Sequence, residues 1–291
     1  MEDIQKEFEM NDQHASPPQA QPGREHEMGD EPEYIRKSYR GTDKLAGKTA
    51  VITGGDSGIG RSVAVHYARE GANIVMAYLA EDQDAEDTRA LVEAEGQRCV
   101  VLKGDVAEPA FCRELIERAV SEFGAINILV NNAAEQHDWD DITDITDEQL
   151  ERTFRTNIFS HFYTVKAALP HMNRGDTIIE SSSVNAFKGN NSLIDYTATK
   201  GAIQGFMRSI SKVLVERGIR VNAVAPGPVW TPLIPATLDE EKVEGFGEQV
   251  PMKRAGQPAE MGPAYVYLAS EESSYMTGQT IHLNGGVILN T

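Results

Sequence analysis

TGGDSGIG, residues 53–60, stands between a short apolar run and a segment with helical spacing, residues 57–70. At such a turn Gly54 permits a tight bend, Gly58 lets the backbone approach a pyrophosphate, and Gly60 lets helix and strand pack closely. The unpaired N–H groups at the start of the helix can then hold the phosphates. The glycine spacing therefore predicts a phosphate cradle at the first strand-to-helix turn of a dinucleotide-binding fold.

The same stretch permits a second interpretation, because GDSG at 55–58 looks like the surroundings of the nucleophile in a trypsin-like serine protease. A histidine base and a buried carboxylate would have to precede Ser57, yet the upstream histidines, His14 and His26, lie in a polar segment. The hydrolase motif G-x-S-x-G also fails, because Ile59 occupies its second glycine position. The all-β pattern of such a protease is absent, so the cradle interpretation is favoured.

The rest of the chain alternates short apolar runs with longer segments of helical spacing. Seven runs are interpreted as buried strands, at 49–53, 73–78, 98–102, 127–130, 177–179, 220–224 and 280–283. Helices are predicted between most of them, at 57–70, 84–95, 109–123, 146–172 and 194–217. This alternation predicts an α/β protein with a doubly wound, seven-stranded parallel sheet (Rossmann fold) and helices on both faces.

Two segments fall outside this rhythm. Residues 1–43 are polar, rich in Pro, Gln and Glu, and without a hydrophobic period, so we expect an N-terminal arm that is flexible or draped over the body. A single Rossmann domain then covers 44–291. Within it, the segment at about 226–258 begins with four prolines between 226 and 235, which indicates a long ordered loop with a short helix. Such an insertion at the carboxyl edge of a sheet is expected to be a substrate lid.

The charge balance restricts the partners of the protein. Asp and Glu number 45 against 27 Lys and Arg, which gives a formal net charge of −18 over 291 residues. So acidic a surface repels nucleic acid and anionic membranes, whereas backbone N–H groups can still hold one dinucleotide. Cys99 and Cys112 lie in apolar periodic stretches and are expected to be free thiols in a reducing compartment. The sequence has no metal-binding motif, signal peptide or membrane-spanning run, so a cytoplasmic location is expected.

A second group of chemically suited residues lies in ESSSVNAFKGNNSLIDYTATK, residues 180–200. Tyr196 and Lys200 are four residues apart on a predicted helix, so their side chains share one face. Ser183 follows the strand around Ile178, and the carboxyl edge of the sheet would bring this serine toward the start of that helix. The pattern Tyr-x-x-x-Lys alone also fits a half-exposed helix face, so its meaning depends on the rest of the chain.

Together these residues resemble the classical short-chain dehydrogenase/reductase family over nearly all of residues 44–291. The matching segments stand in family order: TGGDSGIG at 53–60, GDV at 104–106, NNAA at 131–134, Asn157, Ser183, YTATK at 196–200 and APGPVWTP at 225–232. The similarity is greatest to a bacterial general-stress subgroup, related to glucose dehydrogenases, that carries a similar polar N-terminal arm. It implies an oxidoreductase that transfers a hydride between a nicotinamide dinucleotide and an alcohol or carbonyl compound.

The resemblance implies a catalytic tetrad of Asn157, Ser183, Tyr196 and Lys200. Tyr196 is expected to be the general acid and base, Ser183 to hydrogen-bond the substrate oxygen, and Lys200 to hold ribose hydroxyls. Asn157 is expected to position a chain of water molecules that returns protons to Lys200. A lysine ammonium about 4 Å from a tyrosine contributes ~4 kcal/mol at an effective dielectric of ~20, which predicts a Tyr196 pKa about 3 units below ~10.

The resemblance also implies which residues contact the dinucleotide. They are Gly54, Asp56, Ser57, Gly58, Ile59, Gly60, Tyr78, Leu79, Asp105, Val106, Asn132, Ala133, Ala134, Tyr196, Lys200, Pro226, Gly227, Val229 and Thr231. Asp105 is equally suited to cap a helix, and Asn132 to close a strand. Ala134 stands where the family usually has glycine, and Asn284 where it has aspartate. Four further residues are candidates either for the substrate site or for packing: His137, Trp139, Trp230 and Phe246.

The choice of dinucleotide depends on the charge near the adenosine ribose. In the family, an acidic residue at the end of the second strand selects NAD. A basic residue there, or before the second cradle glycine, accepts the 2′-phosphate of NADP. Here Tyr78 and Leu79 occupy the first place, and Asp56 and Ser57 the second. Because Asp56 and the acids at 81–82 would repel a phosphate, NAD is predicted and NADP is possible.

The leading hypothesis is therefore an NAD-dependent oxidoreductase acting on a small alcohol or carbonyl substrate. The alternative is a non-catalytic dinucleotide-binding regulatory or stress protein on the same fold, which would have no need of Tyr196 and Lys200. A hydrolase is a distant third hypothesis, and activity without a dinucleotide would test it. In the family the two long helices, here 146–172 and 194–217, pair into dimers and then tetramers, so a homotetramer is expected.

Overall fold

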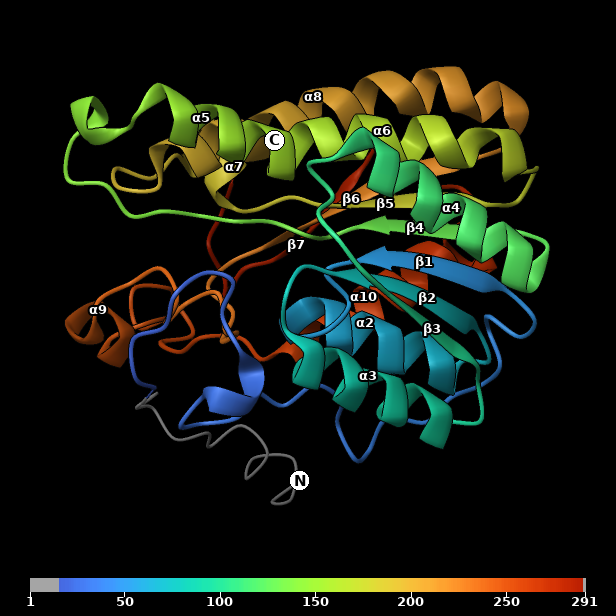
Figure 1. Ribbon diagram of the computed structural model, residues 1–291, viewed down its shortest axis with the longest axis horizontal. Helices are drawn as coiled ribbons and strands as arrows, with labels where there is room; N and C mark the ends of the chain where they lie inside the picture. The colour runs from blue at the N-terminus through green and yellow to red at the C-terminus, as the bar shows by residue number, and fades with distance from the viewer. Residues whose placement is uncertain (1–15, 290–291) are drawn as a thin grey trace.

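The computed structural model describes residues 16–289 of the chain. Seven parallel strands form one sheet in the order β3-β2-β1-β4-β5-β6-β7 (Figure 1). The strands are β1 (Thr49–Thr53), β2 (Asn73–Tyr78), β3 (Cys99–Lys103), β4 (Ile128–Asn131), β5 (Thr177–Ser181), β6 (Arg220–Pro226) and β7 (Thr280–Leu283). Because the strand order reverses between β1 and β4, their carboxyl ends border the crevice in which doubly wound sheets bind ligands. The predicted fold is confirmed.

Helices cover both faces of this sheet. In Figure 1, α2 (Gly58–Arg69), α3 (Asp82–Ala94) and α10 (Pro258–Ala269) lie below the sheet, and α4 (Pro109–Phe123), α6 (Ser160–Ala168) and α8 (Ile194–Leu214) lie above it. Alternate residues of β1 divide between the two layers, with Ala50 and Ile52 in the apolar cluster of one face and Val51 in that of the other. Every residue of β1 is buried, as a central strand of a doubly covered sheet requires.

The prediction of a single α-helix at 146–172 is wrong. It begins as α5 (Asp147–Phe154), which is followed by a π-helical turn, η3 (Arg155–Phe159), and then by α6. Single π-helical turns are rare and frequently lie at functional sites. This one carries Asn157, so the interruption coincides with a residue of the expected tetrad.

The sequence does not predict α10, because Gly262 and Pro263 lie within it and weaken the helical pattern. Gly262 is so close to α2 that a Cβ atom there would lie 2.3 Å from His66 Nδ1, so packing against α2 holds this helix. The shorter elements are η1 (Glu25–Glu27), η2 (Ile142–Asp144), η4 (Leu169–His171), α7 (Asn185–Lys188), η5 (Val215–Arg217), α9 (Glu240–Glu244) and η6 (Glu271–Ser273).

The described part of the N-terminal arm, from residue 16 onward, lies against the body beside the segment 226–258 (Figure 1). Trp230 Nε1 donates a hydrogen bond to the Asp30 carbonyl at 2.8 Å. Met28 of the arm packs in a small apolar cluster with Trp230, Ile234, Val243 and Ala255. The arm is thus draped where it is described, while residues 1–15 lie outside the described residues. The boundaries of the arm and of the substrate lid stay predictions.

Membrane-spanning helices and groups of metal ligands are both absent from the described residues. No helix within residues 16–289 combines the length and the apolar character that crossing a bilayer requires. In that same range, no three His, Cys, Asp or Glu side chains are grouped as ligands of a metal ion.

Candidate active site

A cavity of about 550 Å³ lies at the carboxyl edge of the sheet. Its walls come from the glycine turn after β1, the turn after β4, the end of β5, the start of α8 and the segment 226–258. Of the residues expected in the cofactor site and the tetrad, all line this cavity except Gly60 and Asn157. The topology thus brings together side chains from widely separated stretches of the chain.

The glycine turn has the geometry that a phosphate cradle needs. Gly54 and Gly58 have positive φ angles, +62° and +51°, which residues other than glycine rarely adopt. At Gly60 a Cβ atom would lie 1.7 Å from the Gly54 carbonyl oxygen, so any side chain would force α2 away from the turn. Ser57, Gly58 and Ile59, at the start of α2, line the cavity. The Gly58 N–H is bonded to the Glu25 carboxylate at 2.6 Å. The residues present therefore fit the pyrophosphate of a dinucleotide through the other N–H groups at this helix N-terminus.

The turn after β4 is tied to the glycine turn. The Thr53 hydroxyl accepts the N–H groups of Asn132 and Ala133, at 2.9 and 3.1 Å. The Asn132 side chain donates to the Gly54 carbonyl at 3.0 Å, so it joins the two turns as well as closing a strand. Ala134 has no positive φ angle, so this position does not require the glycine that the family usually has there.

Tyr196 and Lys200 lie one turn apart on α8, and both are buried. Lys200 Nζ lies 5.3 Å from the centre of the Tyr196 ring and donates a hydrogen bond of 2.8 Å to the Ser181 carbonyl. The side chains of Ser183 and Tyr196 are hydrogen-bonded to each other. Tyr196 and Lys200 therefore share one face of α8, with Ser183 beside them just beyond the end of β5.

Burial sets the ionisation of these side chains. It raises the pKa of Tyr196 to about 12, while the hydrogen bond with Ser183 acts in the opposite direction. It lowers the pKa of Lys200 to about 8, although the Glu180 carboxylate favours the charged lysine. The expectation that Lys200 lowers the pKa of Tyr196 is wrong for this arrangement. Desolvation of the Tyr196 hydroxyl outweighs a cation 5.3 Å from the centre of its ring.

Asn157 holds the turn after β4 against α8. Its side-chain oxygen accepts the Glu135 N–H at 2.9 Å, and its amide donates to the Glu135 carbonyl at 2.8 Å. The same amide donates to the hydroxyl of Thr199, the residue before Lys200, at 3.2 Å. Asn157 is fully buried within η3, so the π turn brings its side chain to these partners. The water chain expected from Asn157 stays a prediction.

A residue that the sequence does not single out, Arg152, joins two turns at the cavity wall. It donates to the carboxylate of Asp105 at 2.6 Å and to that of Glu135 at 3.1 Å. Of the two roles left open for Asp105, capping of the next helix is wrong, because α4 begins at Pro109 with Glu108 as its N-cap residue. Asp105 instead accepts the Ala107 N–H at 2.8 Å and lines the cavity.

Two of the four candidate substrate-site residues reach the cavity, His137 and Phe246. Trp230 is fully buried in the apolar cluster with Met28, and Trp139 donates through Nε1 to Asp195 at 3.1 Å. The lining also includes residues that the sequence patterns do not identify: Gln21, Pro22, Gly23, Gln136, Asn185, Lys188 and Asn190. The residues at 185–190 follow Ser183 closely in sequence, so their place in the cavity wall could have been predicted. Nothing in the sequence indicates that the arm residues line the cavity.

A glycine turn at the first strand of a doubly wound sheet, with buried Ser, Tyr and Lys side chains at the same cavity, defines a dinucleotide-dependent oxidoreductase. A family model described as Enoyl-(Acyl carrier protein) reductase matches residues 54–288. The chain belongs to the short-chain dehydrogenase/reductase family. It is accordingly an NAD(P)-dependent enzyme that acts on small molecules.

The chain is similar to proteins from bacteria and from a plant. It is 57% identical to General stress protein 39 of Bacillus subtilis (strain 168), over 93% of this chain and 95% of that protein. It is 50% identical to the glucose and ribitol dehydrogenase of Daucus carota, over 94% of this chain and 97% of that protein. A solved short chain dehydrogenase from Burkholderia cenocepacia J2315 in complex with NADP is 28% identical, with a TM-score of 0.79 over 84% of this chain and 98% of that one. The resemblance to the general-stress subgroup is confirmed.

Proposed function

We propose that this enzyme interconverts an alcohol and a carbonyl compound, with Tyr196 as the general acid and base. The observation that carries the proposal is the grouping of Tyr196, Ser183 and Lys200 in the cavity that also contains the glycine turn. The nicotinamide dinucleotide supplies the hydride in one direction and accepts it in the other. The protein has to bind the substrate oxygen and to move one proton at that oxygen.

Each side chain of the tetrad has a distinct role in this proposal. With a pKa of about 12, Tyr196 is protonated near neutral pH and donates its proton to the carbonyl oxygen during reduction. Ser183, a hydrogen-bond partner of Tyr196, donates to the same oxygen. Lys200, charged below its pKa of about 8, stabilises the tyrosinate that remains and holds ribose hydroxyls. Asn157 positions water molecules that return a proton to Lys200.

The polar lining beyond Ser183 supports a hydroxylated substrate. Asn185, Lys188 and Asn190 line the cavity and can hydrogen-bond hydroxyl groups. Similarity to a protein described as glucose and ribitol dehydrogenase favours the same class. We propose a polyol or its aldehyde, enclosed by residues 226–258 as a substrate lid. A panel of polyols, aldoses, aliphatic alcohols and steroids, followed by nicotinamide absorbance, tests this, and a clear preference for the apolar compounds would contradict it.

We propose NAD as the preferred dinucleotide, with NADP as a possible second cofactor. Asp56 and Glu81 are buried and line the cavity beside Tyr78 and Leu79. A 2′-phosphate at this end would meet carboxylates and no lysine or arginine of the segment 77–81. We expect kcat/KM with NADH to exceed that with NADPH at least about tenfold, and a higher value with NADPH would contradict the proposal.

We propose that the protein is a homotetramer located in the cytoplasm. Phe159 and Phe162 are 40% and 45% exposed, and Val213 at the end of α8 is 66% exposed. The Phe162 ring lies 4.2 Å from that of Phe206 on α8, so α6 and α8 present one apolar surface. A second copy of the chain would cover this surface, which supports the expected pairing of the two long helical segments.

A further inference from the structure

The N-terminal arm reaches the start of the cofactor-binding helix through Glu25, a residue of η1 that is 3% exposed. Its carboxylate accepts the Gly58 N–H, the first of α2, at 2.6 Å, and a hydrogen bond from Arg61 at 2.5 Å. Ser57, the N-cap residue of α2, makes no side-chain cap hydrogen bond. A carboxylate 33 residues upstream therefore caps the helix that forms the cradle.

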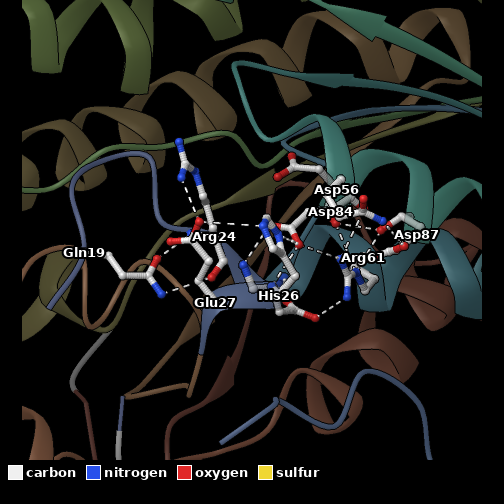
Figure 2. Close-up of polar contacts among 12 residues, drawn as sticks. Gln19, Arg24, His26, Glu27, Asp56, Arg61, Asp84 and Asp87 are labelled. Atoms are coloured by element: carbon white, nitrogen blue, oxygen red, sulfur yellow. Dashed lines mark hydrogen bonds and ion pairs between the residues drawn. The ribbon is translucent and has the colours of Figure 1, made fainter. Parts of the chain in front are cut away.

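Asp84, near the start of α3, holds the arm in this position. The N–H groups of Glu25 and His26 donate to the Asp84 carboxylate at 2.7 and 3.0 Å, and the His26 ring lies 2.8 Å from the same group. Figure 2 shows Arg61 grouped with Asp84 and Asp56, and His26 facing Asp84. Arg61 also donates to the Asp56 carbonyl at 3.0 Å. The guanidinium is thus engaged by the arm, by α3 and by the glycine turn.

Anions outnumber cations around this cap. The pKa of Glu25 is raised to about 7, chiefly by burial, which outweighs the opposite effects of Arg61 and of the Gly58 N–H; the Asp84 carboxylate contributes to the rise. Burial likewise raises the pKa of Asp56 to about 7, with Glu81 and then Asp84 as additional causes. The buried guanidinium of Arg61 thus lies among four buried carboxylates, those of Glu25, Asp56, Glu81 and Asp84. Two of these carboxylates, those of Asp56 and Glu81, line the cavity, so an additional anion at this end of it is unfavourable.

The arm is also part of the cavity wall, because Gln21, Pro22 and Gly23 line it. The Gln21 amide is hydrogen-bonded to the backbone of Gln136. A Cβ atom on Gly23 would lie 2.1 Å from the Pro232 carbonyl oxygen, so the arm is packed tightly against the segment 226–258. Glu25 is thus held on both sides, by the wall residues before it and by Asp84 after it.

We propose that Glu25 determines cofactor specificity by placing a carboxylate beside the adenosine ribose, where it disfavours the 2′-phosphate of NADP. It supplies from the arm the acidic group that the end of β2 lacks at Tyr78 and Leu79. The inference rests on the proposed binding of the dinucleotide across the glycine turn. Ser57 stands where a basic residue would accept the 2′-phosphate, and Glu25 is bonded to the next residue, Gly58. The nearby guanidinium of Arg61 is not free to bind that phosphate, because Glu25 and Asp84 share it.

The test compares the dissociation constants of NAD⁺ and NADP⁺, measured by calorimetry at about pH 8, above the pKa of about 7 of Glu25. In Glu25→Gln we expect the ratio Kd(NADP⁺)/Kd(NAD⁺) to fall at least about tenfold relative to the unaltered protein. Glu31→Gln removes the same charge from an exposed position of the arm and should change the ratio less than about twofold. Glu25→Asp keeps the charge and should keep the ratio within about twofold.

Two outcomes of these titrations would overturn the proposal. An equal change in both affinities in Glu25→Gln, with the ratio unchanged, would mean that Glu25 only caps α2. A selective loss of NADP⁺ affinity in Arg24→Gln would mean that the arm attracts the 2′-phosphate, since Arg24 is the exposed cation next to Glu25.

A second measurement uses the unaltered protein, so it does not depend on whether the Gln variant folds. If Glu25 disfavours the 2′-phosphate, saturating NADP⁺ must loosen η1, and hydrogen exchange of residues 25–27 should be faster with NADP⁺ than with NAD⁺. Equal protection by both would contradict the proposal. The Kd ratio of the unaltered protein tests the NAD preference, and turnover of a Tyr196 variant tests the chemistry. A result that contradicts the NAD preference or the chemistry of Tyr196 can therefore be distinguished from one that contradicts the role of Glu25.

Discussion

The ammonium nitrogen of Lys200 lies 5.3 Å from the centre of the Tyr196 ring, one turn further along α8. Burial favours the neutral forms of both side chains, so the pKa of Tyr196 is about 12 and that of Lys200 about 8. Near neutral pH the pair therefore consists of a neutral tyrosine and a charged lysine. Of the two, Lys200 is the group that titrates in the range where enzymes are usually assayed.

This assigns a pH dependence to carbonyl reduction. Below pH about 8 Lys200 carries its charge, and above it the amine is neutral and no longer stabilises a tyrosinate. We expect kcat/KM, measured with the dinucleotide as the varied substrate, to fall as the pH rises through about 8. Lys200→Met should lower activity and remove this step, whereas Lys212→Met, at an exposed position of α8, should keep it. The same step in Lys200→Met would contradict the assignment.

The cradle should not tolerate a side chain at Gly60. A Cβ atom there would lie 1.7 Å from the Gly54 carbonyl oxygen, so Gly60→Ala has to separate α2 from the turn. We expect it to lower the affinity for NAD⁺ at least about tenfold and the free energy of unfolding by about 2 kcal/mol or more. Gly245→Ala is the control, because Gly245 has a φ of −95° and open space around its Cβ position. Calorimetry and thermal melting measure both effects, and equal behaviour of the two variants would refute the cradle geometry.

Asn157→Ala should uncouple the turn after β4 from the π turn. It removes the partners of the Glu135 N–H and carbonyl and one hydrogen bond to Thr199. Buried groups left without partners cost about 1–3 kcal/mol each, so the melting temperature and kcat should both fall. Asn173→Ala, at an exposed position, should change neither. Normal stability with lost turnover would instead favour a purely catalytic Asn157.

The apolar surface on α6 and α8 predicts how the assembly can be broken. Phe162→Asp places a charge on that surface and should convert the tetramer to smaller species at micromolar concentration. Ile142→Asp changes an equally apolar residue, 65% exposed in η2, and should leave the assembly intact. Light scattering coupled to size-exclusion chromatography measures the mass. A monomeric unaltered protein would refute the proposed assembly.

The strands were predictable because each is a short apolar run, and β1, β4 and β5 are buried throughout. Three of them, β1, β2 and β7, have the bounds expected from their apolar runs. The π turn η3 and the helix α10 were not predictable. The π turn contains Asn157, whose hydrogen-bond partners Glu135 and Thr199 lie in other segments, and α10 depends on the close approach of Gly262 to α2. Local patterns contain neither of these contacts.

The candidate site was predictable where a motif carries its own geometry, as at the glycine turn and at Tyr196 and Lys200. It was not predictable where the N-terminal arm, which has no hydrophobic period, packs against α2, a helix distant from it in sequence. Nothing in the polar sequence around Glu25 indicates that its carboxylate caps α2, 33 residues later. The pKa of Tyr196 was also missed, because pairwise attraction to Lys200 was considered without the desolvation that accompanies burial.

The most direct measurement of the central claim is the steady-state rate of carbonyl reduction by Tyr196→Phe, together with its affinity for NAD⁺. General acid catalysis contributes about 10²- to 10⁴-fold, so we expect kcat to fall by that factor while Kd for NAD⁺ stays within about twofold. Tyr275→Phe, fully exposed, is the matched control and should leave both values unchanged. Turnover by Tyr196→Phe close to that of the unaltered enzyme would contradict the account.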